Sequence, residues 1–344
     1  MKKLTTIAID LAKKVFQVAV YNKYGNQKSN KAMNATQMME VIHQHPEAQI
    51  CMEACGSAHY WGRRFEALEH DVYLVPAHLA AQYRRGNKND LNDVDGIYEA
   101  AKRPKTYFVS VRTLEQQDLA VQHKLRHGYV NQRTQAANRI RGFAREYGVN
   151  FSWGIHRLRH EVPDALEDAD NELTPSGRSS LRELLDQLLA LDRLIEAATR
   201  EIKRMGKLIK ACQELVKIPG IGWITATMLY VRFGNGAAFR CGRDASASIG
   251  LVPAHQGSGG YNRLGKISKR GDKYLRWLII HGARAVINNL RDKQDGLSCW
   301  IRNQLAHKHP NNTTVALANK LVRMALAILK SGESYRAPVA QVAP

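Results

Sequence analysis

Residues 5–21, TTIAIDLAKKVFQVAVY, contain two short apolar segments that are separated by a polar turn. Both segments have the length and the β-branched content of strands, and the short turn favours a hairpin. The alternation continues with the strand-like stretches QICMEAC (49–55) and DVYLVP (71–76), an amphipathic helix WGRRFEALEH (61–70) between them, and a helix from about Ala77. A hairpin followed by this alternation predicts a mixed sheet covered by helices.

The composition is that of a folded protein whose partner is a polyanion. The chain has 344 residues, of which 44% are hydrophobic, enough for two packed cores. Its 51 Lys and Arg exceed 31 Asp and Glu, giving a net charge of +20 that favours nucleic acid as the partner. No apolar run approaches the ~20 residues of a membrane-spanning helix.

The compartment can also be predicted from the sequence. Asp10 interrupts the N-terminal apolar stretch too early for the core of a secretory signal. The five cysteines lack the spacing of a disulfide framework, which indicates reduced thiols. We therefore expect a cytoplasmic, nucleoid-associated protein.

The organisation changes after Pro104, where the pattern becomes almost entirely helical. We expect a mixed-sheet α/β domain over residues 1–116, a helical connector over 117–206, a mostly helical domain over 207–332 and a disordered tail over 333–344. The first connector helix carries a one-signed charge excess that indicates nucleic-acid contact more than an ordinary solvated face. Its candidate contacts are Arg133, Arg139 and Arg141.

The second connector helix should begin near Ser180, because Ser180 and Glu183 fit a capping box. Its apolar residues then follow one another at alternating steps of three and four, at Leu181, Leu184, Leu188, Leu191, Ile195, Ala198, Ile202 and Met205. This spacing predicts the seam of a coiled coil. The seam could close on the preceding helix of the same chain or on another subunit, and the sequence leaves both open.

Acidic residues stand out against this basic background. Asp90 and Asp93 are three apart, which places them on one face of a helix, although helix capping is the simpler account of this pair alone. Asp10 and Glu53 follow or interrupt apolar strands, where acids are not expected. Four converging carboxylates would repel one another unless a divalent metal, Mg²⁺ or Mn²⁺, neutralised them. Two such ions could clamp the attacking and leaving oxygens of a phosphodiester.

Two other motifs are weaker. Cys51, Cys55 and His59 form a C-x3-C-x3-H run, but no second ligand pair has zinc spacing, so buried thiols are the better interpretation. The run from Gly260 matches G-x4-G-K but has Ile267 where a P-loop needs Ser or Thr, which argues against an ATPase.

The C-terminal part contains two glycine-rich stretches. KIPGIG (217–222) has the form of a helix-hairpin-helix turn, although an ordinary tight turn is equally compatible. Ser258 lies in GSGG and could be a nucleophile only if metal or a base activates it. Attack by such a serine would store the phosphodiester bond as phosphoserine, in keeping with the lack of an ATP motif. The candidate phosphate contacts that follow it are Arg263, Lys266, Lys269, Arg270 and Lys273.

Taken in order, the motifs IAIDLAKKVFQV, CMEACGSAHYW, GNKNDLNDVDGIYEAAKRP, KIPGIG and GLVPAHQGSGGYNRLGKISKRGDKYLR resemble the DEDD-type transposases of insertion sequences, the bridge-RNA-guided recombinases. The resemblance covers nearly the whole chain. It implies a RuvC-like domain of the ribonuclease H type, whose four metal-binding carboxylates match Asp10, Glu53, Asp90 and Asp93, and a serine nucleophile that matches Ser258. Asp95 falls outside the pattern.

The resemblance also implies partners. In such proteins a structured guide RNA pairs with donor and target DNA, and domains from different subunits of a dimer or tetramer form composite sites. The protein itself then needs mainly shape and phosphate contacts.

Two rival functions remain. A junction-resolving nuclease would use the same carboxylates with water as the nucleophile and would not need Ser258, whereas a non-catalytic nucleic-acid-binding protein would use its acids as helix caps. A DEDD exonuclease is disfavoured because its D-x-E opening is replaced here by Asp10, Leu11 and Ala12.

Overall fold

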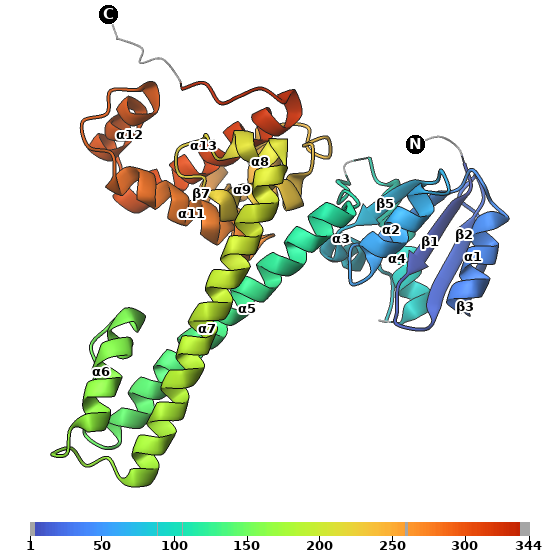
Figure 1. The fold of residues 1–344 in the computed structure, drawn as a ribbon. Helices are drawn as coiled ribbons and strands as arrows, with labels where there is room; N and C mark the ends of the chain where they lie inside the picture. Colours follow the sequence, from blue (N-terminus) through green and yellow to red (C-terminus); the bar gives the residue numbers. More distant parts are fainter. Residues whose placement is uncertain (1–3, 88, 105, 259–260, 338–344) are drawn as a thin grey trace, which may run out of the picture. The chain divides into compact units, whose positions relative to one another are not determined.

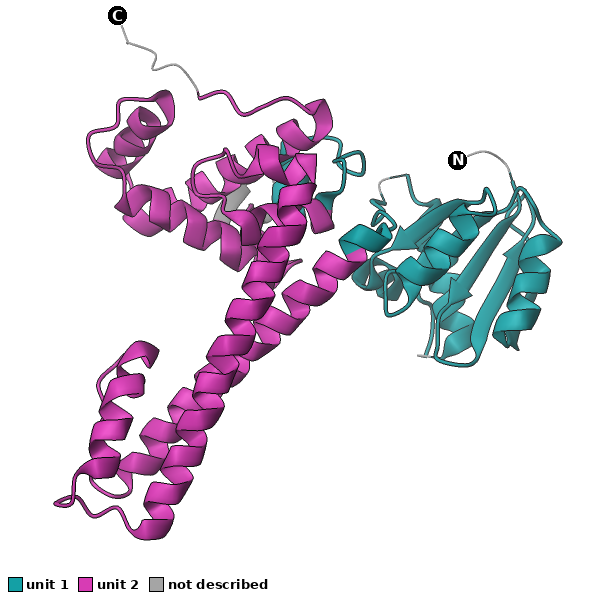
Figure 2. Ribbon diagram, viewed as in Figure 1, with its two compact units in different colours: residues 1–116, 233–248 teal, residues 117–232, 249–344 magenta. Residues whose placement is uncertain are grey.

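The computed structural model describes residues 4–337 except 88, 105 and 259–260, and it leaves out the side chains of residues 255–264. The chain forms two compact units, which Figure 2 shows in different colours. One unit contains Met1–Gln116 and Phe233–Ser248, and the other contains Gln117–Arg232 and Ile249–Pro344.

The first unit is built on a five-stranded mixed sheet, as the opening hairpin predicts (Figure 1). The order of its strands is β3 (Gln27–Met33), β2 (Phe16–Tyr21), β1 (Thr6–Asp10), β4 (Gln49–Glu53) and β5 (Asp71–Val75). The pairs β1–β2 and β2–β3 are antiparallel, whereas β1–β4 and β4–β5 are parallel. The carboxyl ends of β1, β4 and β5 therefore share one edge of the sheet.

The edge strand β3 is the one strand of this five-stranded sheet that the sequence did not predict. Its sequence, QKSNKAM, is polar and mostly exposed, so it has no apolar alternation. Pairing with β2 stabilises it, and Gln17 Nε2 donates a hydrogen bond to Asn30 Oδ1 at 2.6 Å. Lysines on an exposed edge also discourage pairing with other chains.

The two faces of the sheet carry side chains of different size. Ile7 and Ile9 pack under helices α1 (Ala35–His43) and α2 (Ala58–Glu66). The small side chains of Ala8, Ala19 and Cys51 lie on the other face with α3 (Ala77–Tyr83) and α4 (Asp90–Lys102). Small residues let a helix approach the sheet closely, so this face brings α4 near the strand ends.

The connector consists of α5 (Leu114–Arg145), α6 (Ile155–Glu167) and α7 (Pro175–Leu208). The predicted start of the last helix was wrong, because α7 begins with Pro175 and Thr174 accepts the capping hydrogen bond from the backbone N–H of Gly177. The first half of its apolar seam, from Leu181 to Leu191, packs against α5 and α6 of the same chain. The residues that form this core include Ala136, Ile140, Leu158, Val162, Leu181, Leu188 and Leu191.

The C-terminal part contains α8 (Lys210–Leu215), α9 (Trp223–Phe233), α10 (Gly242–Ser248), β6 (Pro253–Ser258), β7 (Tyr261–Ile267), α11 (Lys273–Asn288), α12 (Gly296–His307) and α13 (Pro310–Ser331). The sequence predicted helices here and missed the antiparallel β6–β7 hairpin. Within the described residues, no helix combines the length and apolarity needed to cross a bilayer.

The KIPGIG turn joins α8 to α9, and its central glycine is required by packing. Gly220 has φ +83°, and a Cβ at this position would lie 2.8 Å from the carbonyl oxygen of Gly282 on α11. This close approach of two backbones explains the glycine as part of a tight interhelical turn.

Candidate functional site

Three acids converge at the carboxyl edge of the sheet. Asp10 ends β1, and Asp90 and Asp93 lie in the first turn of α4. One carboxylate oxygen from each lies within 4.8 Å of the others. The structure thus brings together three of the four carboxylates that the sequence nominated.

Helix capping does not account for Asp90. The N-cap of α4 is Asn89, whose Oδ1 accepts a hydrogen bond from the backbone N–H of Asn92 at 2.8 Å. The capping role that the simpler account gave to Asp90 is therefore filled by its neighbour. Asp90 is exposed and Asp93 is partly buried, and a carboxylate oxygen of each belongs to the cluster.

Arg84 is a cation that contacts this cluster directly. Its Nη1 donates to Asp93 Oδ1 at 2.8 Å, and the two side chains are 26% and 18% exposed. Gly96 makes this arrangement possible, since a Cβ there would lie 2.8 Å from the carbonyl oxygen of Ala80 and 3.1 Å from Arg84 Cα. The sequence alone did not assign Arg84 to the site, and its place just upstream of the acids was the only signal.

Glu53 lies beside the cluster, although the three-carboxylate group does not include it. It ends β4, which is parallel to β1 with Ile9 opposite Met52, so Asp10 and Glu53 end neighbouring strands at the same level. Burial raises the pKa of the Cys55 thiol to about 11, and the negative charges of Glu53 and Asp10 add to this effect. The charges of Glu53 and Asp10 therefore both influence the Cys55 thiol.

The donor set suits a hard divalent cation. Carboxylate oxygens are the ligands that Mg²⁺ and Mn²⁺ prefer, and close acids repel one another without a neutralising charge. The thiols nearby do not offer a zinc site of the kind considered above. Cys51 is fully buried, and burial raises its pKa to about 12, so it is a protonated core residue.

The remaining acids of the stretch have structural partners. Asp95 Oδ1 accepts hydrogen bonds from the Tyr21 hydroxyl at 2.5 Å and from Gln27 Nε2 at 2.8 Å. Glu99 pairs with Arg103 one helical turn later. The two hydrogen bonds of Asp95 tie α4 to β2 and β3 and explain why Asp95 stands apart from the cluster.

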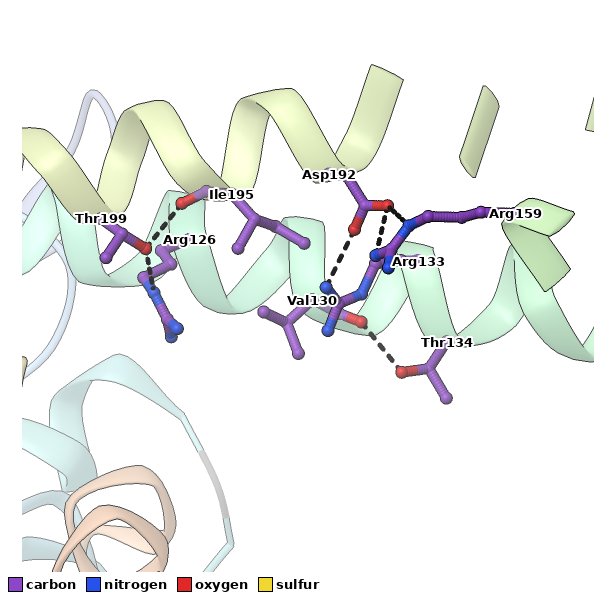
Figure 3. Close-up of polar contacts among 8 residues, drawn as sticks. All are labelled: Arg126, Val130, Arg133, Thr134, Arg159, Asp192, Ile195 and Thr199. Atoms are coloured by element: carbon purple, nitrogen blue, oxygen red, sulfur yellow. Dashed lines mark hydrogen bonds and ion pairs between the residues drawn. The ribbon is translucent and has the colours of Figure 1, made fainter. Parts of the chain in front are cut away.

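The connector cations differ in their surroundings (Figure 3). Arg133 Nη1 donates to Asp192 Oδ1 at 3.0 Å, and Arg159 Nε donates to the second oxygen of Asp192 at 2.9 Å. Arg141 lies over the ring of Trp153, whereas Arg139 is exposed. The structure thus gives Arg133 a role in holding α5, α6 and α7 together.

The C-terminal cations are mostly exposed. Lys266, Lys269, Arg270 and Lys273 all face solvent. Ser258 ends β6 and its backbone pairs with Tyr261, but the side chains of Ser258 and Arg263 lie outside the described residues.

Comparisons with known proteins give one consistent result. A family model described as the transposase IS116/IS110/IS902 family matches residues 212–295, and a second model, described as a transposase, matches residues 7–149. A probable family 20 transposase of Pseudomonas aeruginosa is 36% identical over 97% of this chain and 99% of its own length. The transposase for insertion sequence element IS1111A of Coxiella burnetii is 36% identical over 98% and 92%, and that for IS1328 of Yersinia enterocolitica is 35% identical over 97% and 99%.

Proposed function

The chain belongs to the IS116/IS110/IS902 family of transposases, and on this premise we propose that it moves an insertion sequence by metal-dependent cutting and rejoining of DNA strands. The observation that carries this proposal is the convergence of Asp10, Asp90 and Asp93 within 4.8 Å. The excess of basic residues supports a polyanionic substrate.

The acids have a defined task in this proposal. Asp10, Asp90 and Asp93, with Glu53 from the next strand end, would hold Mg²⁺ or Mn²⁺. When bound, such ions polarise a backbone phosphate and stabilise the charge that develops on its oxygens. Arg84 would orient Asp93, because its guanidinium occupies one oxygen and leaves the other for a ligand. We assign this site to a RuvC-like domain of the ribonuclease H type over residues 1–116.

Ser258 would be the nucleophile, within a domain over residues 207–332. Its hydroxyl oxygen would attack a backbone phosphorus and form a phosphoserine bond, while the bond to a sugar oxygen breaks and the released sugar hydroxyl takes up the proton. The hydroxyl of a second strand would then attack the same phosphorus. The bond to serine breaks, the serine hydroxyl is restored, and the DNA strands are joined without ATP.

The partners follow from this scheme. We propose that a structured guide RNA pairs with donor and target DNA, so that the protein contacts mainly phosphates, through residues such as Arg139, Lys266 and Lys269. A dimer or tetramer would bring the acids of one subunit to the serine of another.

A denaturing gel tests the proposal. Full-length protein, labelled element-end DNA, the candidate RNA and Mg²⁺ should give a DNA–protein adduct that Ser258→Ala and Asp93→Asn both abolish. Cleavage that survives in Ser258→Ala but not in Asp93→Asn would instead indicate a junction-resolving nuclease that uses water. Absence of cleavage by the wild type under all conditions would favour a non-catalytic binding protein.

A further inference from the structure

One face of α11 carries an exposed row of basic and aromatic side chains. Lys273, Trp277, His281 and Arg284 are spaced by four, four and three residues, which places them along one side of a helix. All four are exposed, and Trp277 is 46% exposed. The opposite side of α11 is buried through Leu275, Leu278, Ile279 and Ala283. We call the four exposed residues the α11 stripe.

The tryptophan of the stripe is part of a row of rings. The rings of Tyr274 and Trp277 are nearly parallel, with centroids 6.2 Å apart, and the His281 ring lies 4.6 Å beyond Trp277. On the other side, His127 of α5 lies 4.7 Å from Tyr274. Aromatic neighbours restrict the orientation of a surface ring, so Trp277 is presented to solvent in a defined position.

The loop that precedes α11 is held rigidly and presents further cations. Arg276 is buried, and its Nη1 donates to the carbonyl oxygens of Ile249 at 2.8 Å and Arg270 at 3.0 Å. The backbone N–H of Lys269 donates to the carbonyl oxygen of Gly250. Gly250 is tightly fitted there, because a Cβ would lie 2.3 Å from the carbonyl oxygen of Arg270. Arg276 is thus a structural brace, whereas Lys269 and Arg270 point into solvent.

The charge of this face is one-signed. The α11 sequence, KYLRWLIIHGARAVIN, contains no Asp or Glu, and the acid that directly precedes it, Asp272, caps the helix by accepting a hydrogen bond from the Leu275 N–H. Exposed cations on both sides of an exposed indole are the arrangement that tracks a phosphate backbone while unpaired bases stack on an aromatic ring.

We propose that the α11 stripe binds an unpaired DNA strand, with one base stacked on Trp277 and the flanking phosphates on Lys273 and Arg284. The inference rests on the proposed function, since cutting and exchanging DNA strands exposes unpaired bases. A duplex cannot use the indole in this way, because its bases are stacked inside and a ring on a helix surface reaches only splayed bases. The stripe therefore selects for separated strands over duplex.

Fluorescence anisotropy of the full-length protein with a labelled oligothymidine strand tests this assignment. Trp277→Ala should weaken binding of the single strand by about tenfold, the effect of losing one base–aromatic stack. Trp277→Phe should retain most of the affinity, and binding of a duplex of mixed sequence should not change. Tyr24→Ala is the matched control, because Tyr24 is an aromatic residue that is 73% exposed in the turn between β2 and β3 and lies far from the stripe in sequence.

The outcomes separate this inference from the proposed function. Equal single-strand binding by Trp277→Ala and wild type, or an equal loss for duplex, would overturn the inference even if the DNA–serine adduct forms normally. A selective loss for an oligouridine RNA strand would overturn the choice of DNA. Loss of the adduct in Asp93→Asn tests the proposed function alone, since Asp93 does not lie on α11.

Discussion

Arg84 Nη1 and Asp93 Oδ1 lie 2.8 Å apart, so a cation from the end of α3 pairs with one of the three clustered carboxylates. A bound divalent ion would neutralise the same acids. Arg84 and the ion would therefore each reduce the repulsion among these carboxylates, so the effect of one should be smaller when the other is present.

Arg84→Gln should lower the free energy of unfolding by about 1 kcal/mol in metal-free buffer, because three close carboxylates lose their cation. Saturating Mn²⁺ should reduce this loss, since the ion replaces the missing charge. Urea unfolding of both proteins, with and without Mn²⁺, measures the two differences. A loss that is the same in both buffers would show that Arg84 and the ion act at separate places.

Gly96→Ala should destabilise the first unit by about 1–3 kcal/mol, because the new Cβ meets the backbone of α3 at 2.8 Å. It should also weaken Mn²⁺ binding by displacing the turn that carries Asp93. Gly128→Ala is the matched control, since Gly128 is also helical but a Cβ at its position would have nothing within 4 Å, and it should be neutral or stabilising. Thermal unfolding of both variants distinguishes these outcomes, and equal effects would contradict the packing argument.

Asp192→Asn should destabilise the connector by about 1–3 kcal/mol, because it leaves Arg133 and Arg159 without their shared carboxylate. Glu196→Gln removes an ion pair with Arg200 whose side chains are 67% and 70% exposed, and it should have little effect. Chemical denaturation compares the two variants. If Asp192→Asn unfolded like wild type and only its DNA affinity changed, Arg133 would be a phosphate contact and not a structural residue.

His123 should make stability depend on pH. It is 2% exposed, and burial, followed by the positive charge of Arg126, lowers its pKa from 6.5 to about 4. Between these two values the unfolded chain binds a proton that the folded chain does not, so the free energy of unfolding falls as the pH falls, by about 1.4 kcal/mol per pH unit. The stability that the neutral, buried His123 contributes is fully present above pH 6.5 and is lost as the pH falls towards 4.

The variant His123→Gln should show a shallower loss of stability over this range. Urea unfolding at several pH values measures the slopes, with His160→Gln as the control because His160 is exposed. Identical slopes for wild type and His123→Gln would show that His123 is not the group responsible.

The sequence predicted those strands that contain buried apolar residues, and it missed the strands that lack them. The hairpin of β1 and β2 and the strands β4 and β5 follow from buried apolar residues, whereas β3 and β6 are polar or glycine-rich and become strands only by pairing with a neighbour. The start of α7 was also predicted wrongly from a local capping signal. Ser180 has a good capping sequence, but the helix already starts at Pro175 and is capped by Thr174.

The site was predictable in its residue types but not in its geometry. Acids at strand ends and at one helix face are visible in the sequence, and the sheet register then brings Asp10 level with Glu53. Asp93 belongs to the carboxylate cluster, whereas Asp95 does not. This difference depends on tertiary contacts with Arg84 and Tyr21, which no local sequence pattern encodes. The same holds for Arg133, which resembles other surface cations in sequence but pairs with Asp192.

Calorimetric titration with Mn²⁺ tests most directly whether the acids form a metal site. Wild type should bind Mn²⁺, and Asp10→Asn and Asp93→Asn should each weaken binding by at least about tenfold, because each removes a charged ligand. Asp95→Asn should bind like wild type, since Asp95 lies on the same helix but contacts Tyr21 and Gln27. No binding heat with wild type, or equal heats for wild type and all three variants, would contradict the account.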